Sequence, residues 1–466
     1  MLTPTKTQTY EDLFVGLEAP IPTLHRKNQR YINLDSAAST PPLKAVQEAV
    51  DQFAPYYSSV HRGMGYKSQL STYAFEKARE ITLRFVGASP ETHVCIFGKN
   101  ATEAINTLAH RFPFTPERNI VLTSGMEHHS NDLPWRAVAE VIHLGLAQNG
   151  ALDEDDFDAK LEQYAGQVAL VAISGASNVT GFLNPIHRLA EKAHAVGAQI
   201  AVDCAQLAPH RKIEMLSLDG PRHLDYIAIS AHKMYAPYGT GALIGRRDTF
   251  ERGVPFLHGG GTVKVVTLDE VHWANFRDEA GSPNTVGAVA LAAAIRELER
   301  IGMETVAEHE ISLTRYAFRR LKEVPGIKIY GDSDPERASH RLGVITFNLQ
   351  GVSDILVTAI LGYEFGIGLR NGRFCAYPYT MALLELSSDE VEEVNHSILA
   401  GDYCNIPGLV RASLGLYNTP ADVDALVEAL MCIVNKQYQG KYTQNLATGD
   451  FVPEGWQPGF DEVLAF

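Results

Sequence analysis

The feature that most restricts the fold of this chain is a regular alternation, between residues 93 and 245, of short apolar segments and amphipathic helical patterns. Segments rich in Val and Ile lie at 93–97, 119–123, 168–174, 199–203, 226–230 and 241–245. Helical spacing of apolar residues separates most of them, as in residues 186–196. Continuous apolar strands that alternate with such helices are typical of βα units. The sequence therefore predicts an α/β protein with a mostly parallel sheet covered by helices on both faces.

The pattern changes on either side of this region. The first 30 residues are polar and contain proline, which predicts an N-terminal arm with a short helix. A helical pattern at 285–301 ends the alternation, and a strand at 343–349 with helices at 352–363 and 420–434 follows. We therefore expect an arm at 1–30 that joins the small domain, a large domain at 31–302, and a small α+β domain at 303–466. The tail after residue 449 is expected to be irregular.

Charge and cysteine usage exclude several classes of protein. The formal net charge is −15, so no basic surplus is available for binding nucleic acid. The five cysteines form no CxxC pair, which argues against a disulfide scaffold and a thiolate metal site, and we expect no metal. No apolar stretch approaches the roughly 20 residues of a membrane span, and the N-terminus lacks the pattern of a signal peptide. The sequence predicts a soluble, cytoplasmic protein without a membrane partner.

Polar residues follow the apolar strands, at the edge of a parallel sheet where ligands bind. Ala101 and Thr102 begin a helix after the first strand, which indicates either an anion site or a simple helix cap. His128 and His129 follow the second strand and suggest a base, an aromatic platform or a structural histidine. Adjacent side chains point in different directions, so a chelating pair is disfavoured.

Two later strands end in ionisable residues. Asp203 closes an apolar strand, where a carboxylate needs a cation or a protonated ring nitrogen unless it caps the next turn. Ser230, His232 and Lys233 occupy a loop rich in Gly and Pro, in which a lysine is either solvated or desolvated and nucleophilic. A phosphate cradle, a stacking histidine, an aspartate and a Schiff-base lysine together match the needs of pyridoxal phosphate.

With these residues the chain resembles the class V aminotransferase group of fold-type I pyridoxal-phosphate enzymes. It is most similar to the group II (SufS-type) cysteine desulfurases and their selenocysteine-lyase relatives. The resemblance covers most of the chain and is carried by motifs that include LDSAAS (34–39), VHRG (60–63), NATEAIN (100–106), MEHHSN (126–131), SNVTG (177–181), VDCAQ (202–206), SAHKMYAPYGTG (230–241), EAGSPNT (279–285) and RASLGLYNT (411–419). It implies a large domain with a sheet of the seven-stranded type and a small C-terminal domain.

The resemblance also implies a role for each matching residue. Lys233 would hold pyridoxal 5'-phosphate covalently, His128 would stack on its ring, and Asp203 would pair with the ring nitrogen. The remaining cofactor contacts would be Gln206 at the phenolic oxygen and Ala101, Thr102, Ser230 and His232 at the phosphate. The substrate site would be lined by Asn178 and Arg411, which bind the carboxylate, and by Arg370, Ala38 and Arg62.

The resemblance implies a homodimer whose sites lie at the interface. EAGSPNT resembles a segment that reaches the partner's phosphate, with Ser282 in place of the usual threonine, and Arg62 resembles a residue that lines the neighbouring site. The substrate would be a small amino acid, and a protein would serve as the sulfur acceptor.

Cys375 decides the class of reaction. In the related desulfurases a loop cysteine takes sulfur from the substrate as a persulfide, and R-x-G-x-x-C-A-x-P (370–378) fits that loop. We expect nearby arginines to favour the thiolate. The other four cysteines are expected in the core.

The chain departs from the related loop in two ways. Arg373 and Phe374 stand where a His pair is usual, and an insertion at 379–408 carries a helical pattern and Cys404. The expected function is a pyridoxal-phosphate-dependent, desulfurase-like activity on cysteine or selenocysteine that yields alanine and a persulfide on Cys375. The alternative is a β-eliminating C–S lyase or an epimerase that acts on a cysteine-derived or secondary-metabolite amino acid.

Overall fold

The computed structural model describes residues 10–251, 253–276, 278–404 and 406–464. It divides the chain into two compact units, which are described separately here. One unit comprises Ser39–Asn178 and Phe182–His309, and we call it the sheet unit. The other, the C-terminal unit, comprises the N-terminal residues up to Ala38, Val179–Gly181 and Glu310–Phe466. Residues 31–38 thus belong with the C-terminal unit, and the second boundary falls inside helix α8 (Met303–Leu321).

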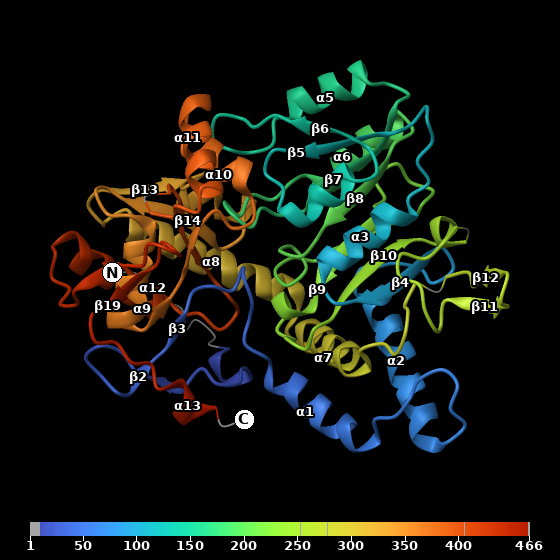
Figure 1. The fold of residues 1–466 in the computed structure, drawn as a ribbon, viewed down its shortest axis with the longest axis horizontal. Helices are drawn as coiled ribbons and strands as arrows, with labels where there is room; N and C mark the ends of the chain where they lie inside the picture. The colour runs from blue at the N-terminus through green and yellow to red at the C-terminus, as the bar shows by residue number, and fades with distance from the viewer. Residues whose placement is uncertain (1–9, 252, 277, 405, 465–466) are drawn as a thin grey trace. The chain divides into compact units, whose positions relative to one another are not determined.

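A seven-stranded sheet forms the centre of the sheet unit, as expected (Figure 1). Its spatial order is β4 (His93–Gly98), β10 (Gly241–Arg246), β9 (Tyr226–Ser230), β8 (Gln199–Asp203), β7 (Val168–Ser174), β5 (Ile120–Ser124) and β6 (Glu140–Leu144). β10 is antiparallel to β4 and β9, and the remaining pairs are parallel. β4 therefore has the same direction as β9, and both end at the same edge of the sheet.

Helices cover this sheet. α6 packs against β7 and β8, α3 against β4, β9 and β10, α5 against β6, and α2 against β4 and α7. The helices of this unit are α1 (Lys44–Phe53), α2 (Tyr66–Phe85), α3 (Ala101–Arg111), α4 (Leu133–Arg136), α5 (Glu154–Gln163), α6 (Ile186–Ala195) and α7 (Thr285–Ile301), with short 3-10 turns η2 (Ala54–Tyr56), η3 (His129–Asn131), η4 (Ala231–Lys233) and η5 (Arg247–Phe250). A hairpin of β11 (Val263–Val266) and β12 (Val271–Trp273) extends from the unit (Figure 1).

The C-terminal unit contains an antiparallel sheet in the order β13 (Ile327–Tyr330), β14 (Val344–Leu349), β17 (Leu409–Ser413) and β16 (Arg370–Gly372). Its other elements are η1 (Glu11–Leu13), β1 (Pro20–Ile21), β2 (Gln29–Arg30), β3 (Ile32–Asn33), η6 (Pro335–His340), α9 (Asp354–Phe365), β15 (Ile367–Gly368), α10 (Tyr377–Leu383), α11 (Ser388–Leu399), α12 (Pro420–Val434), β18 (Tyr442–Gln444), β19 (Phe451–Pro453) and α13 (Phe460–Val463). The core joins the buried faces of this sheet to residues of α8, α9 and α12, with Phe318, Phe347 and Leu430 fully buried. The tail after residue 449 is more regular than expected, because it contains β19, which pairs with β18, and the short helix α13.

None of the helices in the part of the chain that the structure describes combines the length and apolar character that crossing a bilayer requires.

A charged cluster lies at the amino end of β9, at the opposite end of that strand from Ser230. Buried Asp225 faces the Nε2 atoms of His194 at 2.9 Å and His223 at 3.2 Å, one on each carboxylate oxygen. The two imidazole rings are stacked, with centroids 4.0 Å apart, so their ring-plane lone pairs do not converge as metal ligation by both requires. Each Nδ1 lies within 2.8 Å of a backbone carbonyl, which only accepts, so each ring also donates there. The geometry therefore does not favour a metal bound by both rings.

This cluster changes the pKa values of its members. Burial alone would raise the pKa of Asp225, but the hydrogen bonds from His194, His223 and the Ile200 amide outweigh burial and hold that pKa well below its ordinary value. The hydrogen bond to Asp225 raises the pKa of His223 against the effect of burial.

We predict that His223→Gln lowers the thermal midpoint mainly at slightly acid pH. A histidine whose pKa is raised by folding stabilises the folded state below its unfolded pKa, and this contribution is lost as the pH rises through the folded pKa. The wild type should exceed the variant by about 2–4 °C at about pH 6, and the gap should narrow towards pH 9. Differential scanning fluorimetry over this range measures it, with the exposed His272→Gln as control. A gap that widens with pH would contradict the assignment.

Candidate active site

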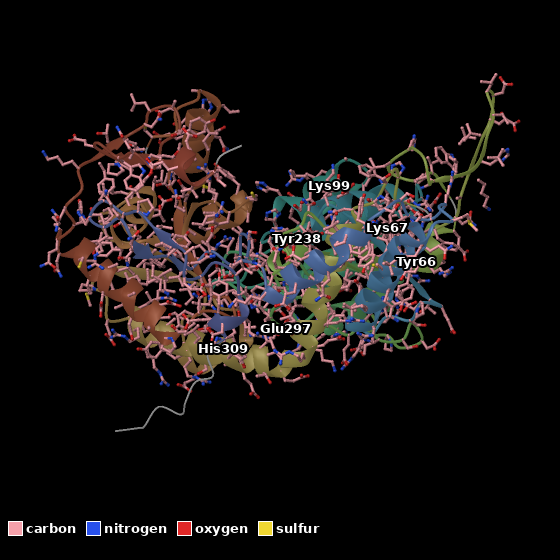
Figure 2. The ribbon with its side chains drawn as sticks, turned by 90° about the horizontal axis from the view of Figure 1, so that it is seen from below. Tyr66, Lys67, Lys99, Tyr238, Glu297 and His309 are labelled. Atoms are coloured by element: carbon pink, nitrogen blue, oxygen red, sulfur yellow. The ribbon has the colours of Figure 1, made fainter. Side chains whose placement is uncertain are left out.

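The predicted cofactor residues of the sheet unit gather at the carboxyl edge of its sheet. β8 ends at Asp203, β9 ends at Ser230 and continues into η4 with Lys233, and the loop after β5 carries His128. β4 leads into α3, whose N-terminus carries Thr102. Figure 2 labels Lys99 on the exposed loop just before that helix.

Asp203 and Lys233 form the electrostatic pair of this edge. Asp203 is buried, and its Oδ1 accepts the Ala205 amide at 2.9 Å. Burial raises the pKa of Asp203, while that amide and the positive charge of Lys233 oppose the rise. Such a carboxylate could pair with a protonated ring nitrogen of a bound cofactor.

The loop that carries Lys233 is held in place by its backbone. The His232 carbonyl accepts the Thr40 amide at 3.0 Å and its hydroxyl at 2.9 Å, and Thr40 in turn accepts the Tyr235 amide at 2.9 Å. At the end of the loop, a Cβ on Gly241 would lie 2.5 Å from Cα of Asn100, so the close approach of these backbones requires glycine. Burial and the neighbouring Lys233 charge lower the pKa of His232 to about 4, so this ring is neutral at physiological pH.

The N-terminus of α3 lies beside the end of β9. The Ala101 amide donates to the Ser230 Oγ at 2.8 Å, and the Thr102 and Ser130 hydroxyls lie 2.7 Å apart. Asn100 caps the helix by accepting the Glu103 amide at 3.1 Å. Backbone amides, hydroxyls and the positive helix end together form a surface suited to a phosphate.

His128 lies at the start of η3. Its Nδ1 accepts the Ser130 amide at 3.1 Å, which assigns the proton of a neutral ring to Nε2. The His129 ring is tilted by 48° to it with a centroid separation of 6.4 Å. Asn178 and Gln206 are buried in the same unit.

The structure adds one residue that the sequence did not single out, Glu127. Its buried carboxylate accepts hydrogen bonds from the Ser124 and Ser174 hydroxyls, the Ser174 amide at 3.0 Å and the Asn131 amide group at 2.8 Å. It thereby ties the loop that carries His128 to the end of β7. Burial raises the pKa of Glu127 to about 7 despite these donors. Glu127 lies within the segment MEHHSN (126–131), but nothing in the sequence shows that its carboxylate contacts Ser124 and Ser174.

Arg62 and Ser282 lie elsewhere in the sheet unit. Both line a cavity of about 560 Å³ with Arg79, Arg247 and Glu279, and Lys233 is not among the described residues that line it. Ser282 is exposed.

The C-terminal unit brings together Arg370, Arg411 and Cys375. Arg411 on β17 lies opposite Arg370 on β16 and is buried, and burial lowers its pKa. The Phe374 ring covers its guanidinium at 4.7 Å, and the charge of Cys375 acts on it. The Cys375 side chain is exposed, and both Phe374 and Cys375 have φ values in the left-handed region, at 52° and 53°.

The segment 379–408 contains the end of α10 and the whole of α11. A capping box of Ser387 and Glu390 begins α11, and Tyr377 donates to Asn395 at 2.7 Å across the helices. Residue 405 lies outside the described residues. Ala38, expected at the substrate, is partly buried in this unit.

The prediction of four core cysteines is only half right. Cys95 and Cys204 are buried, and burial raises both pKa values, that of Cys95 to about 12. Cys404 and Cys432 are partly exposed. Cys404 follows the end of α11, a helix with no buried residues among those described, so this part of the chain provides no apolar core for its side chain.

Comparison with known proteins defines the class of this fold and site. Residues 32–426 match the family model of class-V aminotransferases, and the chain belongs to this family. It is a pyridoxal-phosphate-dependent enzyme. The residues of the carboxyl edge fit that cofactor, because they offer a lysine, a buried carboxylate in its field, a ring and a helix N-terminus with hydroxyls.

The relatives narrow the class to cysteine desulfurases. The chain is 36% identical over 409 residues to a probable cysteine desulfurase of Halalkalibacterium halodurans, covering 86% of this chain and 92% of the relative. It is 34% identical over 431 residues to a cysteine desulfurase of Pectobacterium carotovorum, covering 90% and 97%. An apo cysteine desulfurase structure from Thermococcus onnurineus is similar with a TM-score of 0.77 and 31% identity, covering 93% of this chain and all of that one.

We predict that Glu127→Gln flattens the acid part of the stability profile. A carboxylate whose pKa rises on folding is favourable while protonated, so its contribution falls between its unfolded pKa of about 4.5 and its folded pKa. The thermal midpoint of the wild type, relative to Glu127→Gln, should therefore decrease from about pH 5 to pH 7 and then level off. Scanning fluorimetry checks this, with the exposed Glu91→Gln as control. A difference that grows with pH would refute a buried, partly protonated Glu127.

Proposed function

We propose that this enzyme removes sulfur from cysteine, or selenium from selenocysteine, and yields alanine and a persulfide on Cys375. The observation that carries the proposal is the exposed Cys375 thiol beside the buried Arg411. The relatives named cysteine desulfurase, at 33–36% identity over most of the chain, support the same activity.

In this proposal the residues of the sheet unit hold the cofactor. Lys233 binds it covalently, Asp203 keeps the ring nitrogen protonated, His128 stacks on the ring and Gln206 contacts the phenolic oxygen. The phosphate is bound by Ala101, Thr102, Ser230 and His232. When bound, pyridoxal phosphate withdraws electrons from the substrate Cα.

The chain's own residues carry out the remaining steps. Asn178 and Arg411 bind the substrate carboxylate, and Lys233 takes the Cα proton. Cys375 Sγ then forms a bond to the substrate sulfur while the Cβ–S bond breaks, and the electron pair stays with the carbon. Protonation of Cβ and return of a proton to Cα give alanine, and the sulfur remains on Cys375 as the persulfide.

Exposed apolar residues of the sheet unit support a homodimer. The β11–β12 hairpin exposes Val265, Val266 and Leu268, and Met64 and Tyr66 near the start of α2 are also exposed. Figure 2 labels Tyr66 at the surface. A second copy would cover these side chains and receive Ser282 and Arg62 at its cofactor site. We also propose a protein acceptor for the sulfur and a cytoplasmic location.

We expect the products to distinguish desulfuration from elimination. Purified enzyme given L-cysteine should form alanine and a Cys375 persulfide, and Cys375→Ser should lose both by at least about 100-fold because Cys375 is the thiol whose charge acts on Arg411. Chromatography of alanine and pyruvate and mass spectrometry of the protein measure this. Cys404→Ser is the matched control. Pyruvate as the product, unaffected by Cys375→Ser, would establish the eliminating lyase instead.

Lys233→Ala should give a colourless, inactive protein. The covalent link to the cofactor absorbs visible light, and no other lysine shares the field of Asp203 among the described residues. Absorbance spectra before and after borohydride test this, with Lys99→Ala as control. Retained colour with normal turnover would reject the assignment.

A further inference from the structure

Two arginines of the C-terminal unit face each other across paired strands. β16 and β17 are antiparallel neighbours, and Arg370 lies directly opposite Arg411. Residues in such a pair share one face of the sheet, and like charges there are destabilising. The pair therefore requires an anion nearby.

Asp35 supplies that anion. Its Oδ2 accepts from Nε and Nη2 of Arg370 at 3.0 and 2.9 Å, and its Oδ1 accepts from Nη2 of Arg411 at 3.1 Å. Each carboxylate oxygen therefore serves one guanidinium. The exposed side-chain fractions are 52% for Arg370, 18% for Asp35 and 3% for Arg411. Arg370 therefore lies at the surface, and Arg411 is buried.

The backbone holds Asp35 in this position. Asp35 bridges to Ser413, two residues beyond Arg411, and the Ser413 amide donates to the Leu34 carbonyl at 2.7 Å. The Ala37 amide donates to the Ser413 hydroxyl at 2.9 Å. These contacts hold the Asp35 carboxylate beside the strand that carries Arg411.

The charge of the group sets what it can bind. Two guanidinium groups and one carboxylate leave one positive charge, and the double contact of Asp35 occupies Arg370. Asp35 contacts Arg370 through two nitrogens but Arg411 through one, so the group keeps a net positive charge beside Arg411, whose guanidinium lies against the Phe374 ring. One carboxylate of a bound amino acid neutralises the remaining positive charge of this group. A second carboxylate on the same amino acid would be repelled by the negative charge of Asp35.

We propose that Asp35 is a specificity-determining residue: by occupying Arg370 it restricts the substrate site to amino acids with one carboxylate. This inference rests on the proposed role of Arg411 in binding the substrate carboxylate. Without the Asp35 charge, Arg370 becomes available to a second carboxylate.

The test compares the holoenzyme and Asp35→Asn by calorimetric titration with L-alanine and L-aspartate, which requires no turnover. Misplacement of Arg411 weakens both ligands, but release of Arg370 favours only the dicarboxylate. The ratio of the aspartate Kd to the alanine Kd should therefore fall about fivefold or more in Asp35→Asn. Asp461→Asn, on the exposed α13, controls for net charge and should leave the ratio unchanged.

If Asp35→Asn does not fold, alanine binding to Arg370→Gln provides a second test of the proposal. This substitution leaves Asp35 to neutralise Arg411, so alanine should bind about fivefold more weakly. An unchanged ratio in folded Asp35→Asn, or unchanged alanine binding in Arg370→Gln, overturns the proposal. Failure of the wild type to form alanine and a persulfide from cysteine would instead reject the proposed function, so the two failures are distinguishable.

Discussion

The interaction on which the sheet unit's chemistry depends is the one between buried Asp203 and Lys233. A carboxylate at the end of an apolar strand is costly to ionise, and the raised pKa of Asp203 reflects that cost. The lysine charge opposes the rise, and so would a protonated ring nitrogen. The fold sustains this arrangement because β8 and β9 are parallel neighbours, so their following residues meet at one edge.

Other acidic side chains in both units also need a positive charge or hydrogen-bond donors nearby, and each obtains them from different neighbours. Asp225 has stacked histidines and Arg246, and its pKa falls. Glu127 has only neutral donors, and its pKa rises because hydrogen bonds do not fully replace water. Asp35 has two arginines. For Asp225 and Glu127, the neighbouring charges and hydrogen bonds therefore decide the direction in which the pKa moves, and burial alone does not.

The sequence predicted elements that are apolar throughout and missed elements that are not. The strands β7, β8 and β9 are almost wholly buried, so their apolar runs located them. β6 lies at the edge of the sheet with an exposed Glu140 and His143, and its mixed pattern gave no strand signal. The tail hairpin β18–β19 packs through scattered aromatic residues, including a contact of Tyr363 with Trp456 at 5.2 Å, which periodicity cannot reveal.

The residues of the candidate site also fall into those that the sequence could predict and those that it could not. Lys233, Asp203 and His128 follow strands and carry motifs, so their grouping could be predicted from topology. Asp35 and Arg411 are 376 positions apart in the chain, and their contact depends on the bridge between Asp35 and Ser413. The spacing of residues in the sequence does not indicate such a contact. Glu127 could not be predicted for the same reason, because its contact with Ser174 joins residues that are distant in the chain.

The departure at Arg373 and Phe374 separates two tasks that a histidine pair can combine. An aromatic ring still lies against Arg411, because Phe374 contacts the guanidinium face at 4.7 Å and shields it from water. The ionisable nitrogen is gone, since neither phenylalanine nor arginine exchanges a proton near neutral pH. The left-handed backbone at Phe374 and Cys375 is costly for both residues, and it persists where packing such as this ring contact holds it. The loop therefore exposes the Cys375 thiol and places the Phe374 ring against Arg411. The proton that completes the proposed alanine must come from another group, such as Lys233, or from water.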